Sequence, residues 1–184
     1  MNYLKLAQIF NRSRWQTMSV WRKGTDEYWI TDTYVMIRLD HSTFSKFKSK
    51  YCSFKNNPYI PDLEIDQKIR IQERRLLDRG VDMQKIINEE AGAKTVDFIK
   101  MLFVEPYNEN YNAVYVGDDF AGAIDYDYFQ LFGWDNTFKA HRSLSPVFVY
   151  NDKGELYGVM MPIRYFGELE KEIEKFKAVL KGGE

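Results

Sequence analysis

Four aspartates lie close together in the second half of the chain: Asp118, Asp119, Asp125 and Asp127. Carboxylate oxygens are the ligands that hard cations such as Mg²⁺ prefer, so in principle this cluster offers an enzyme a metal site. Asp118 and Asp119, however, stand where a helix is predicted to begin, and carboxylates there cap free N–H groups. Capping is the favoured interpretation, and we expect neither a metal site nor a cofactor.

Other signs of catalysis are weak. His41 and His141 are the two histidines of the chain, and each is better explained as a surface or loop residue than as a general base. The sequence lacks the glycine-rich phosphate and dinucleotide motifs, the H-E-x-x-H zinc motif and the G-x-S-x-G elbow. We therefore expect no catalytic residue, no small-molecule substrate and no enzymatic activity. An enzyme that uses the four aspartates and a metal is the least favoured alternative.

Between Phe44 and Pro61 the sequence is basic and aromatic. Ammonium groups contact phosphates and aromatic rings stack on bases, so the lysines of this segment are candidate nucleic-acid ligands. These lysines are Lys46, Lys48, Lys50 and Lys55. In an extended segment the first three would share one face. The alternative, favoured on this feature alone, is the solvated face of an edge strand, where lysines discourage aggregation.

The composition is that of a globular protein. With 184 residues, of which 45% are hydrophobic, the chain can bury a core and is most simply one domain. The 26 Lys and Arg are balanced by 27 Asp and Glu, so DNA or anionic membranes would attract the chain only through a local patch. Cys52 is the single cysteine, and no segment is apolar enough to span a membrane. We therefore expect a cytoplasmic protein without a membrane partner.

The first part of the chain is predicted to form a helix followed by strands. Apolar residues at helical spacing predict a short amphipathic helix over residues 3–10. Extended runs follow at residues 17–21 and 27–39, and alternation in the second run predicts a half-buried strand. Residues 22–26 carry the glycine and polar residues of a hairpin loop between the two runs.

Residues 56–94 interrupt this pattern and are predicted to be an insertion. Most of the segment indicates charged helices, with Asp82 as an N-cap and Gly92 as a stop. The short alternation around Ile69 and Ile71 fits a strand as well, so that alternative stays open.

Strands and helices return after residue 95. We predict strands at 96–104 and 111–116, a short helix within 118–134, a hairpin of 145–150 with 155–165, and an amphipathic helix at 167–182. The predicted fold class is α+β, with antiparallel sheets, two short packed helices, an inserted charged region and a C-terminal amphipathic helix. The elements are expected to form one domain over residues 1–184.

Three segments match short motifs of a known family. They are WITDTYVMIRL (residues 29–39), VGDDFAGAIDYDYFQLFGW (116–134) and SPVFVYNDKGELYGVMMPIRY (145–165). In this order they resemble the T-D-G-[YH]-R-L-A strand motif, the F-N-x-x-Y-L-L-D-A-L segment and the closing M-P-M-R-L hairpin of the bacterial DNA polymerase sliding clamp, or beta-clamp, family. The hairpin match is the most specific. Position 33 is Thr where the motif has Gly, and Val35 replaces its Arg.

The resemblance implies a clamp-like domain in a ring that encircles duplex DNA, tethers polymerases during DNA replication and holds partner peptides in a hydrophobic pocket. Residue by residue, it assigns one wall of that pocket to Thr31, Asp32 and Tyr34. It assigns the other wall to Met161, Pro162, Ile163 and Arg164. The family's chain has three such domains and this chain has room for one, so a ring would require a homo-oligomer.

The favoured interpretation is a non-enzymatic sliding-clamp-like protein, either a DNA-replication accessory factor or a binder of clamp-partner peptides. Its implied partners are DNA and clamp-binding proteins. The alternative is a protein-interaction module that keeps the clamp fold without encircling DNA. Residues 123–134 favour this alternative, because they contain Asp125 and Asp127 but no Lys or Arg, and attraction to phosphate requires positive charge.

Overall fold

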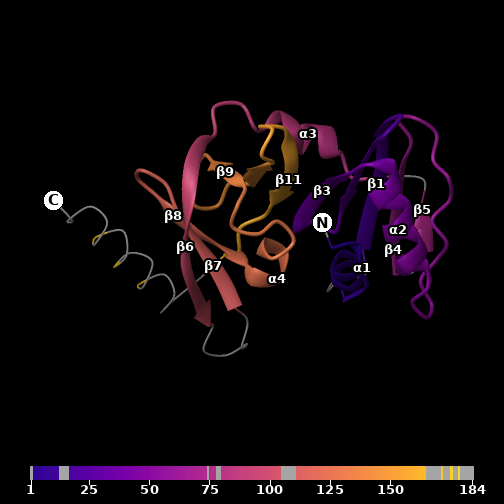
Figure 1. Cartoon of the computed structure of the whole chain (residues 1–184), viewed down its shortest axis with the longest axis horizontal. Coiled ribbons are helices and arrows are strands. Elements are labelled where there is room, and N and C mark those ends of the chain that lie inside the picture. Colours follow the sequence, from indigo (N-terminus) through magenta and orange to yellow (C-terminus); the bar gives the residue numbers. More distant parts are fainter. Residues whose placement is uncertain are drawn as a thin grey trace. The chain divides into compact units, whose positions relative to one another are not determined.

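The computed structural model describes residues 2–12, 17–73, 75–77, 80–104 and 111–164, together with Lys171, Lys175 and Ala178. The chain divides into two compact units, Met1–Glu89 and Glu90–Glu184 (Figure 1). Both units combine helices with antiparallel strands, which confirms the predicted α+β class. The single clamp-like domain over residues 1–184 stays a prediction.

The first unit contains an antiparallel sheet and helices that, in the sequence, precede its first strand, separate its third strand from its fourth and follow its last strand. Its elements are α1 (Tyr3–Arg12), β1 (Thr17–Gly24), β2 (Glu27–Thr31), β3 (Val35–Leu39), α2 (His41–Cys52), β4 (Lys68–Gln72), β5 (Arg75–Leu77) and α3 (Met83–Asn88). The strand order is β5-β4-β1-β2-β3. The predicted N-terminal helix and the strand at residues 17–21 are confirmed, and both run a few residues further than expected.

Helix α2 lies beside α1 and the sheet of the first unit (Figure 1), and its aromatic residues make the contacts. Phe44, Phe47 and Tyr51 recur at helical spacing, so they lie on one face, and all three are buried. The Phe47 ring meets the Phe10 ring of α1 edge to face, with the centroids 5.8 Å apart. The extended conformation considered for residues 46–50 is therefore wrong: the spacing of the aromatic residues outweighs the alternation of the lysines.

The predicted extended run at residues 27–39 is two antiparallel strands, β2 and β3, joined by a tight turn. Buried Asp32 holds this turn, because its carboxylate accepts hydrogen bonds from the backbone N–H groups of Tyr34 and Val35, both at 3.0 Å. Thr33, which follows Asp32 in the turn, has a φ of 85°. One continuous strand was the wrong prediction, because the turn contains neither of the residues, Gly and Pro, that usually mark one.

Replacing Thr33 by glycine is expected to raise the free energy of unfolding by about 1 kcal/mol. A φ of 85° lies in the left-handed region, where a β-branched residue is strained and glycine is not. Part of the gain is lost because glycine is more flexible in the unfolded chain. Urea unfolding of the wild type, Thr33→Gly and Thr33→Ala measures the effect, and only the glycine variant should be clearly stabilised. A glycine variant less stable than the wild type would contradict the described turn.

Residues 68–72 and 75–77 form strands, so the charged helix predicted for this stretch is wrong and the strand alternative is correct. β4 pairs with β1, and its residues alternate between buried and half-buried positions, with Ile69 and Ile71 facing the core. The edge of β1 that β2 does not occupy explains this outcome. The apolar residues of 68–72 fit the period of a helix or of a strand, and the strand completes the backbone hydrogen bonds of β1. The assignment of residues 56–94 as an insertion stays a prediction.

The cap of α3 was predicted correctly and its end was not. Asp82 accepts a hydrogen bond from the backbone N–H of Lys85 at 3.4 Å, as expected of an N-cap. The helix ends at Asn88, ahead of the predicted stop. Gly92 lies in the following turn with a φ of 81°, so the glycine serves the turn rather than the helix end.

The second unit also contains an antiparallel sheet. Its elements are β6 (Lys94–Val104), β7 (Tyr111–Val116), β8 (Ala121–Asp125), α4 (Tyr126–Phe129), β9 (Thr137–Ala140), β10 (Val147–Tyr150) and β11 (Leu156–Met160). Its strand order is β11-β10-β9-β6-β7-β8. Residues 94–96 of β6 pair with β9, and residues 97–98 and 102–104 pair with β7, with a register shift between Phe98 and Leu102. The Phe98 ring packs beside this change of partner, 4.5 Å from the Phe129 ring and 4.7 Å from the Phe138 ring, centroid to centroid.

The helix predicted within residues 118–134 is mostly wrong. Its first half forms β8, which pairs with β7, and α4 adds only four helical residues. Pairing with β7 buries nearly the whole strand and overrides the helical spacing of its apolar residues. Asp118 and Asp119 lie in the bend before β8, so they do not cap a helix. Asp125 caps α4 instead and accepts a hydrogen bond from the Asp127 N–H at 2.9 Å.

The predicted C-terminal hairpin is confirmed, since β10 and β11 pair antiparallel across residues 151–154. β11 ends at Met160, so Pro162 follows the strand and costs no ladder hydrogen bond. Of the terminal helix predicted at 167–182, the structure describes Lys171, Lys175 and Ala178, which are helical, and the rest lies outside the described residues. Within the described parts of the chain, no helix is long and apolar enough to cross a membrane.

Candidate functional site

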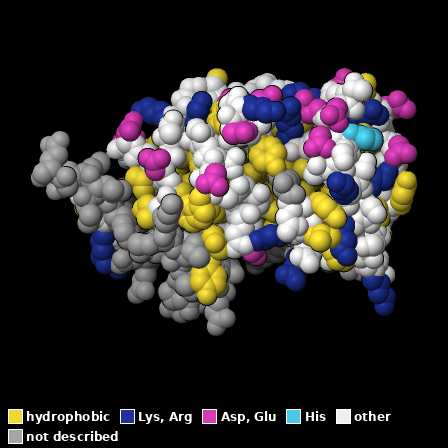
Figure 2. Space-filling model, in the orientation of Figure 1, with side chains coloured by type: hydrophobic (Ala, Val, Ile, Leu, Met, Phe, Trp, Pro, Cys, Tyr) yellow, Lys and Arg dark blue, Asp and Glu magenta, His cyan; other side chains and the backbone are white. Residues whose placement is uncertain are grey.

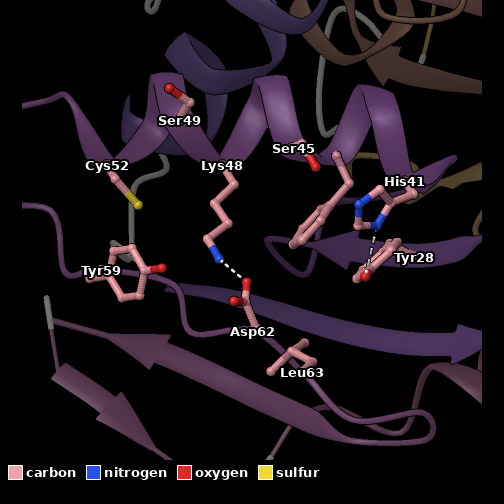
Figure 3. A pocket seen from close by; sticks show the side chains of 10 residues that line it. Tyr28, His41, Ser45, Lys48, Ser49, Cys52, Tyr59, Asp62 and Leu63 are labelled. Carbon is pink, nitrogen blue, oxygen red and sulfur yellow. Dashed lines mark hydrogen bonds and ion pairs between the residues drawn. The ribbon is translucent and has the colours of Figure 1, made fainter.

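A cavity of about 360 Å³ lies between α2 and the segment that follows it in the first unit (Figure 3). We call it the α2 groove. It is lined by Tyr28, His41, Phe44, Ser45, Lys48, Ser49, Cys52, Tyr59, Asp62 and Leu63. Figure 3 shows that α2 carries one wall and that Tyr59, Asp62 and Leu63 form the opposite wall.

The helical wall follows from the sequence once α2 is recognised as a helix. His41, Ser45, Lys48 and Cys52 recur at intervals of three or four residues, so their side chains share one face, next to the buried aromatic face. The helix begins at a strong cap: the Asp40 carboxylate accepts hydrogen bonds from the Thr43 N–H at 2.7 Å and from its hydroxyl at 2.9 Å. The cap fixes where this polar face begins.

Replacing Asp40 by alanine is expected to lower the free energy of unfolding by about 1 kcal/mol near neutral pH, while Asp40→Asn should cost much less. The hydrogen bond from the Thr43 N–H is the largest cause that holds the pKa of Asp40 below its usual value. A lowered pKa means that the stabilisation is present above the pKa of the unfolded chain and is lost as the pH falls through the lower pKa of the folded state. We expect urea unfolding between pH 7 and pH 3 to show that the wild type and Asp40→Ala differ less in their free energy of unfolding below about pH 4. A pH-independent difference would contradict the ionic cap.

The floor of the groove is aromatic and apolar. The rings of Tyr28 and Phe44 stack nearly in parallel, with centroids 4.1 Å apart, and Leu63 is also buried. The Tyr28 hydroxyl lies 3.3 Å from Nδ1 of His41 at the end of the floor (Figure 3). Such a surface favours an apolar or aromatic group, because the rings offer flat area that water solvates poorly.

Lys48 reaches across the groove to the opposite wall. Its Nζ lies 2.6 Å from Oδ1 of Asp62 and 4.8 Å from the centre of the Tyr59 ring. Burial lowers the pKa of Lys48, but the hydrogen bonds to Asp62 and Tyr59 outweigh burial and leave this pKa above its usual value. The hydrogen bond from Lys48 holds the pKa of Asp62 below its usual value. Both groups are therefore charged at neutral pH.

His41 and Cys52 of the groove do not form a pair of nucleophile and base. The Cys52 thiol donates to the Pro58 carbonyl oxygen at 3.6 Å. His41 and Cys52 are the first and last residues of α2, roughly 16 Å apart along its axis. Within the described residues, no group of three or more His, Cys, Asp or Glu side chains is arranged to hold a metal ion. Asp118 instead lies 3.8 Å from the Lys94 ammonium, on the second unit.

The four lysines predicted to bind nucleic acid do not share a face. On a helix, Lys46 and Lys50 lie one above the other, whereas Lys48 points in nearly the opposite direction, into the groove. The Lys50 ammonium lies 5.1 Å from the Phe54 ring, and Lys55 is exposed beyond the helix. Figure 2 shows basic and acidic side chains interspersed over the visible face. Nucleic-acid binding by these lysines stays a prediction, without the common face that motivated it.

The residues assigned to a peptide pocket by the clamp resemblance are divided between the two units. In the first unit, Thr31 and Asp32 are buried and Tyr34 is half-buried. In the second unit, Met161, Pro162 and Ile163 are half-buried and Arg164 is exposed. The Ile163 N–H donates to the Ala123 carbonyl oxygen at 2.9 Å, and its side chain packs against Ala121 and Ala123 of β8. Ile163 therefore covers the edge of its own sheet.

Most residues of the α2 groove escaped the sequence analysis. Lys48 was singled out as a nucleic-acid ligand, His41 as a surface or loop histidine, Phe44 as a ring of the basic and aromatic segment and Cys52 as the single cysteine, but none of them was assigned to a groove. A usable signal was present: polar residues at helical spacing beside aromatic residues at helical spacing indicate a helix with one buried face and one polar face. The opposite wall has no such signal, because residues 57–64 form neither helix nor strand.

Comparison with protein-family models, with curated proteins and with solved structures found no match. The resemblance to the sliding-clamp family stays a prediction, and the geometry of the α2 groove is the basis of the functional proposal below.

Proposed function

We propose that this chain is a non-enzymatic protein-interaction module that binds a short segment of a partner protein in the α2 groove. The observation that carries the proposal is the cavity of about 360 Å³ with an aromatic floor and a polar rim. Ligand pockets have this composition and volumes of roughly 300–1,000 Å³. Near the lower end of that range, the groove suits one large anchor side chain and its neighbouring backbone.

The length of the groove supports a peptide as its ligand. The polar face of α2, from His41 to Cys52, extends for roughly 16 Å. About five residues of an extended peptide cover the same length. On the opposite wall, Tyr59 is 67% exposed, and exposed tyrosines are common contact residues in protein interfaces.

Panning a random-peptide phage library against the folded chain tests this function. We expect enriched peptides to carry a large apolar residue and to slow alkylation of Cys52, which lines the groove and is the only cysteine of the chain. Panning against Ser45→Trp, whose new ring fills the groove, should not enrich the same peptides. The matched control is Lys46→Trp, which places the same ring on the exposed side of α2. Peptides that are enriched equally on Ser45→Trp, or no enrichment on the wild type, would overturn the proposal.

A sliding-clamp-like role is the second candidate, and the turn at position 33 favours it. The family motif has glycine there, and Thr33 has the positive φ that favours glycine. In this role the chain forms a homo-oligomeric ring around DNA and binds clamp-partner peptides. Light scattering should then give the mass of a ring, and a clamp-binding peptide should bind. A monomer that ignores such a peptide would exclude this role and leave the α2 groove proposal intact.

A further inference from the structure

We infer that the partner segment carries an acidic side chain next to its apolar anchor and that this carboxylate replaces Asp62 on the ammonium group of Lys48. The inference rests on the proposed function and names the chemistry of the partner. Asp62 would then be an internal substitute that occupies the anion position while the groove is empty.

The two members of the ion pair differ greatly in exposure. The Lys48 side chain is 15% exposed, whereas the Asp62 side chain is 96% exposed. Figure 3 shows that Lys48 extends from α2 into the groove and meets the Asp62 carboxylate of the opposite wall. If Asp62 rotates away, its carboxylate stays hydrated, so its release is inexpensive. If Lys48 loses its anion, however, the ammonium of a mostly covered side chain remains unpaired, which costs more.

Because losing its anion costs Lys48 more than release costs Asp62, the groove favours a ligand that brings its own carboxylate. A neutral segment that displaces Asp62 leaves the Lys48 ammonium without a counter-charge, and a basic segment adds a second cation beside it. Among the described residues that line the groove, Lys48 is the only Lys or Arg. A segment with a carboxylate restores the charge-assisted hydrogen bond and places its apolar group on the stacked rings of Tyr28 and Phe44.

Two small probes with matched shapes test the inference: 3-phenylpropionate, which combines an aromatic ring with a carboxylate, and its neutral amide, 3-phenylpropionamide. We expect NMR titrations of the folded chain to show that the carboxylate binds more tightly than the amide, by on the order of tenfold. The shifted amide signals should come from residues 41–52 and 59–63. The preference should weaken with added salt, because it depends on charge.

Two substitutions locate the effect. Lys48→Met keeps the length of the side chain and removes the charge, so it should abolish the preference for the carboxylate, while Lys46→Met should leave it unchanged. Asp62→Asn removes the internal competitor and should strengthen binding of 3-phenylpropionate by about two- to fivefold. Asp66→Asn, in the exposed turn of the same segment, is the matched control.

The outcomes distinguish a failure of the acidic anchor from a failure of peptide binding in the α2 groove. Equal binding of the two probes, a preference that survives in Lys48→Met, or weaker binding by Asp62→Asn would overturn the acidic anchor. Failure of both probes to bind would also overturn it. Phage panning on the wild type and on Ser45→Trp tests peptide binding separately, because it does not require a charged ligand.

Discussion

Replacing Gly122 by alanine is expected to destabilise the chain by about 3 kcal/mol, near the upper end for overpacking a core. Gly122 lies in β8 opposite Tyr115 of β7, whose buried ring crosses the position where a side chain would begin. A Cβ atom at residue 122 would overlap this ring and lie 2.7 Å from the Ser143 carbonyl oxygen. The Tyr115 hydroxyl donates to that same carbonyl at 2.7 Å, so moving the ring also breaks a hydrogen bond.

Urea unfolding of Gly122→Ala measures this cost, and Gly24→Ala is the matched control in a strand. A Cβ at Gly24 would lie 3.7 Å from its nearest neighbour, which is ordinary contact, so this change should cost little. In a Tyr115→Leu background, the Gly122→Ala cost should fall, because the ring that causes the overlap is gone. Equal costs for the two glycines would show that Tyr115 does not pack across Gly122.

Replacing Phe47 by alanine is expected to cost about 3–5 kcal/mol of unfolding free energy, the usual range for deleting a fully buried ring. Phe47 is completely buried on α2, where it contacts the Phe10 ring of α1 and stacks near Tyr51. Because the same helix carries one wall of the α2 groove, the change should also accelerate alkylation of Cys52.

Thermal or urea unfolding gives the first effect, and the rate of iodoacetamide labelling gives the second. Lys46→Ala is the control on the exposed side of the same helix and should change the stability by no more than about 0.5 kcal/mol. If residues 46–50 were extended, Lys46 and Phe47 would lie on opposite faces of a strand and the Phe10 contact would be lost. A Phe47→Ala variant as stable as Lys46→Ala would contradict the burial of Phe47 against Phe10.

Local signals predicted those elements that have their own turn or cap. The hairpin of β10 and β11 is such a case: the Asn151 side chain accepts hydrogen bonds from the N–H groups of Lys153 and Glu155, and Gly154 supplies a positive φ. The cap at Asp82 is another. In both places the residues that determine the conformation are within a few positions of one another, so a short stretch of sequence is enough to predict it.

Prediction failed where a neighbouring strand decides the conformation. Residues 121–125 fall within the helix predicted at 118–134, yet they form β8, because β7 offers a partner and Gly122 leaves room for the Tyr115 ring. β4 is a strand because β1 has a free edge beside it. β1 is far from β4 in the sequence, whereas β7 ends only four residues before β8, but in neither case does the pattern within the segment itself report the pairing.

The candidate site was predicted less well than the fold. Lys48 was chosen for its charge and its companions Lys46 and Lys50, but the helix separates it from both. Its contact with Asp62 joins a helix to an irregular segment, and an irregular segment has no period that places its side chains. Composition thus drew attention to Lys48, but it did not predict the contact with Asp62.

The most direct test of the α2 groove is the affinity of the peptides selected on the wild-type chain, measured by isothermal titration calorimetry on three proteins. We expect the wild type and Lys46→Trp to bind with the same dissociation constant. Ser45→Trp should bind on the order of tenfold more weakly or not at all, because its ring occupies the place of the anchor side chain. Equal affinity of all three proteins would show that the peptides bind elsewhere and would contradict the proposed function.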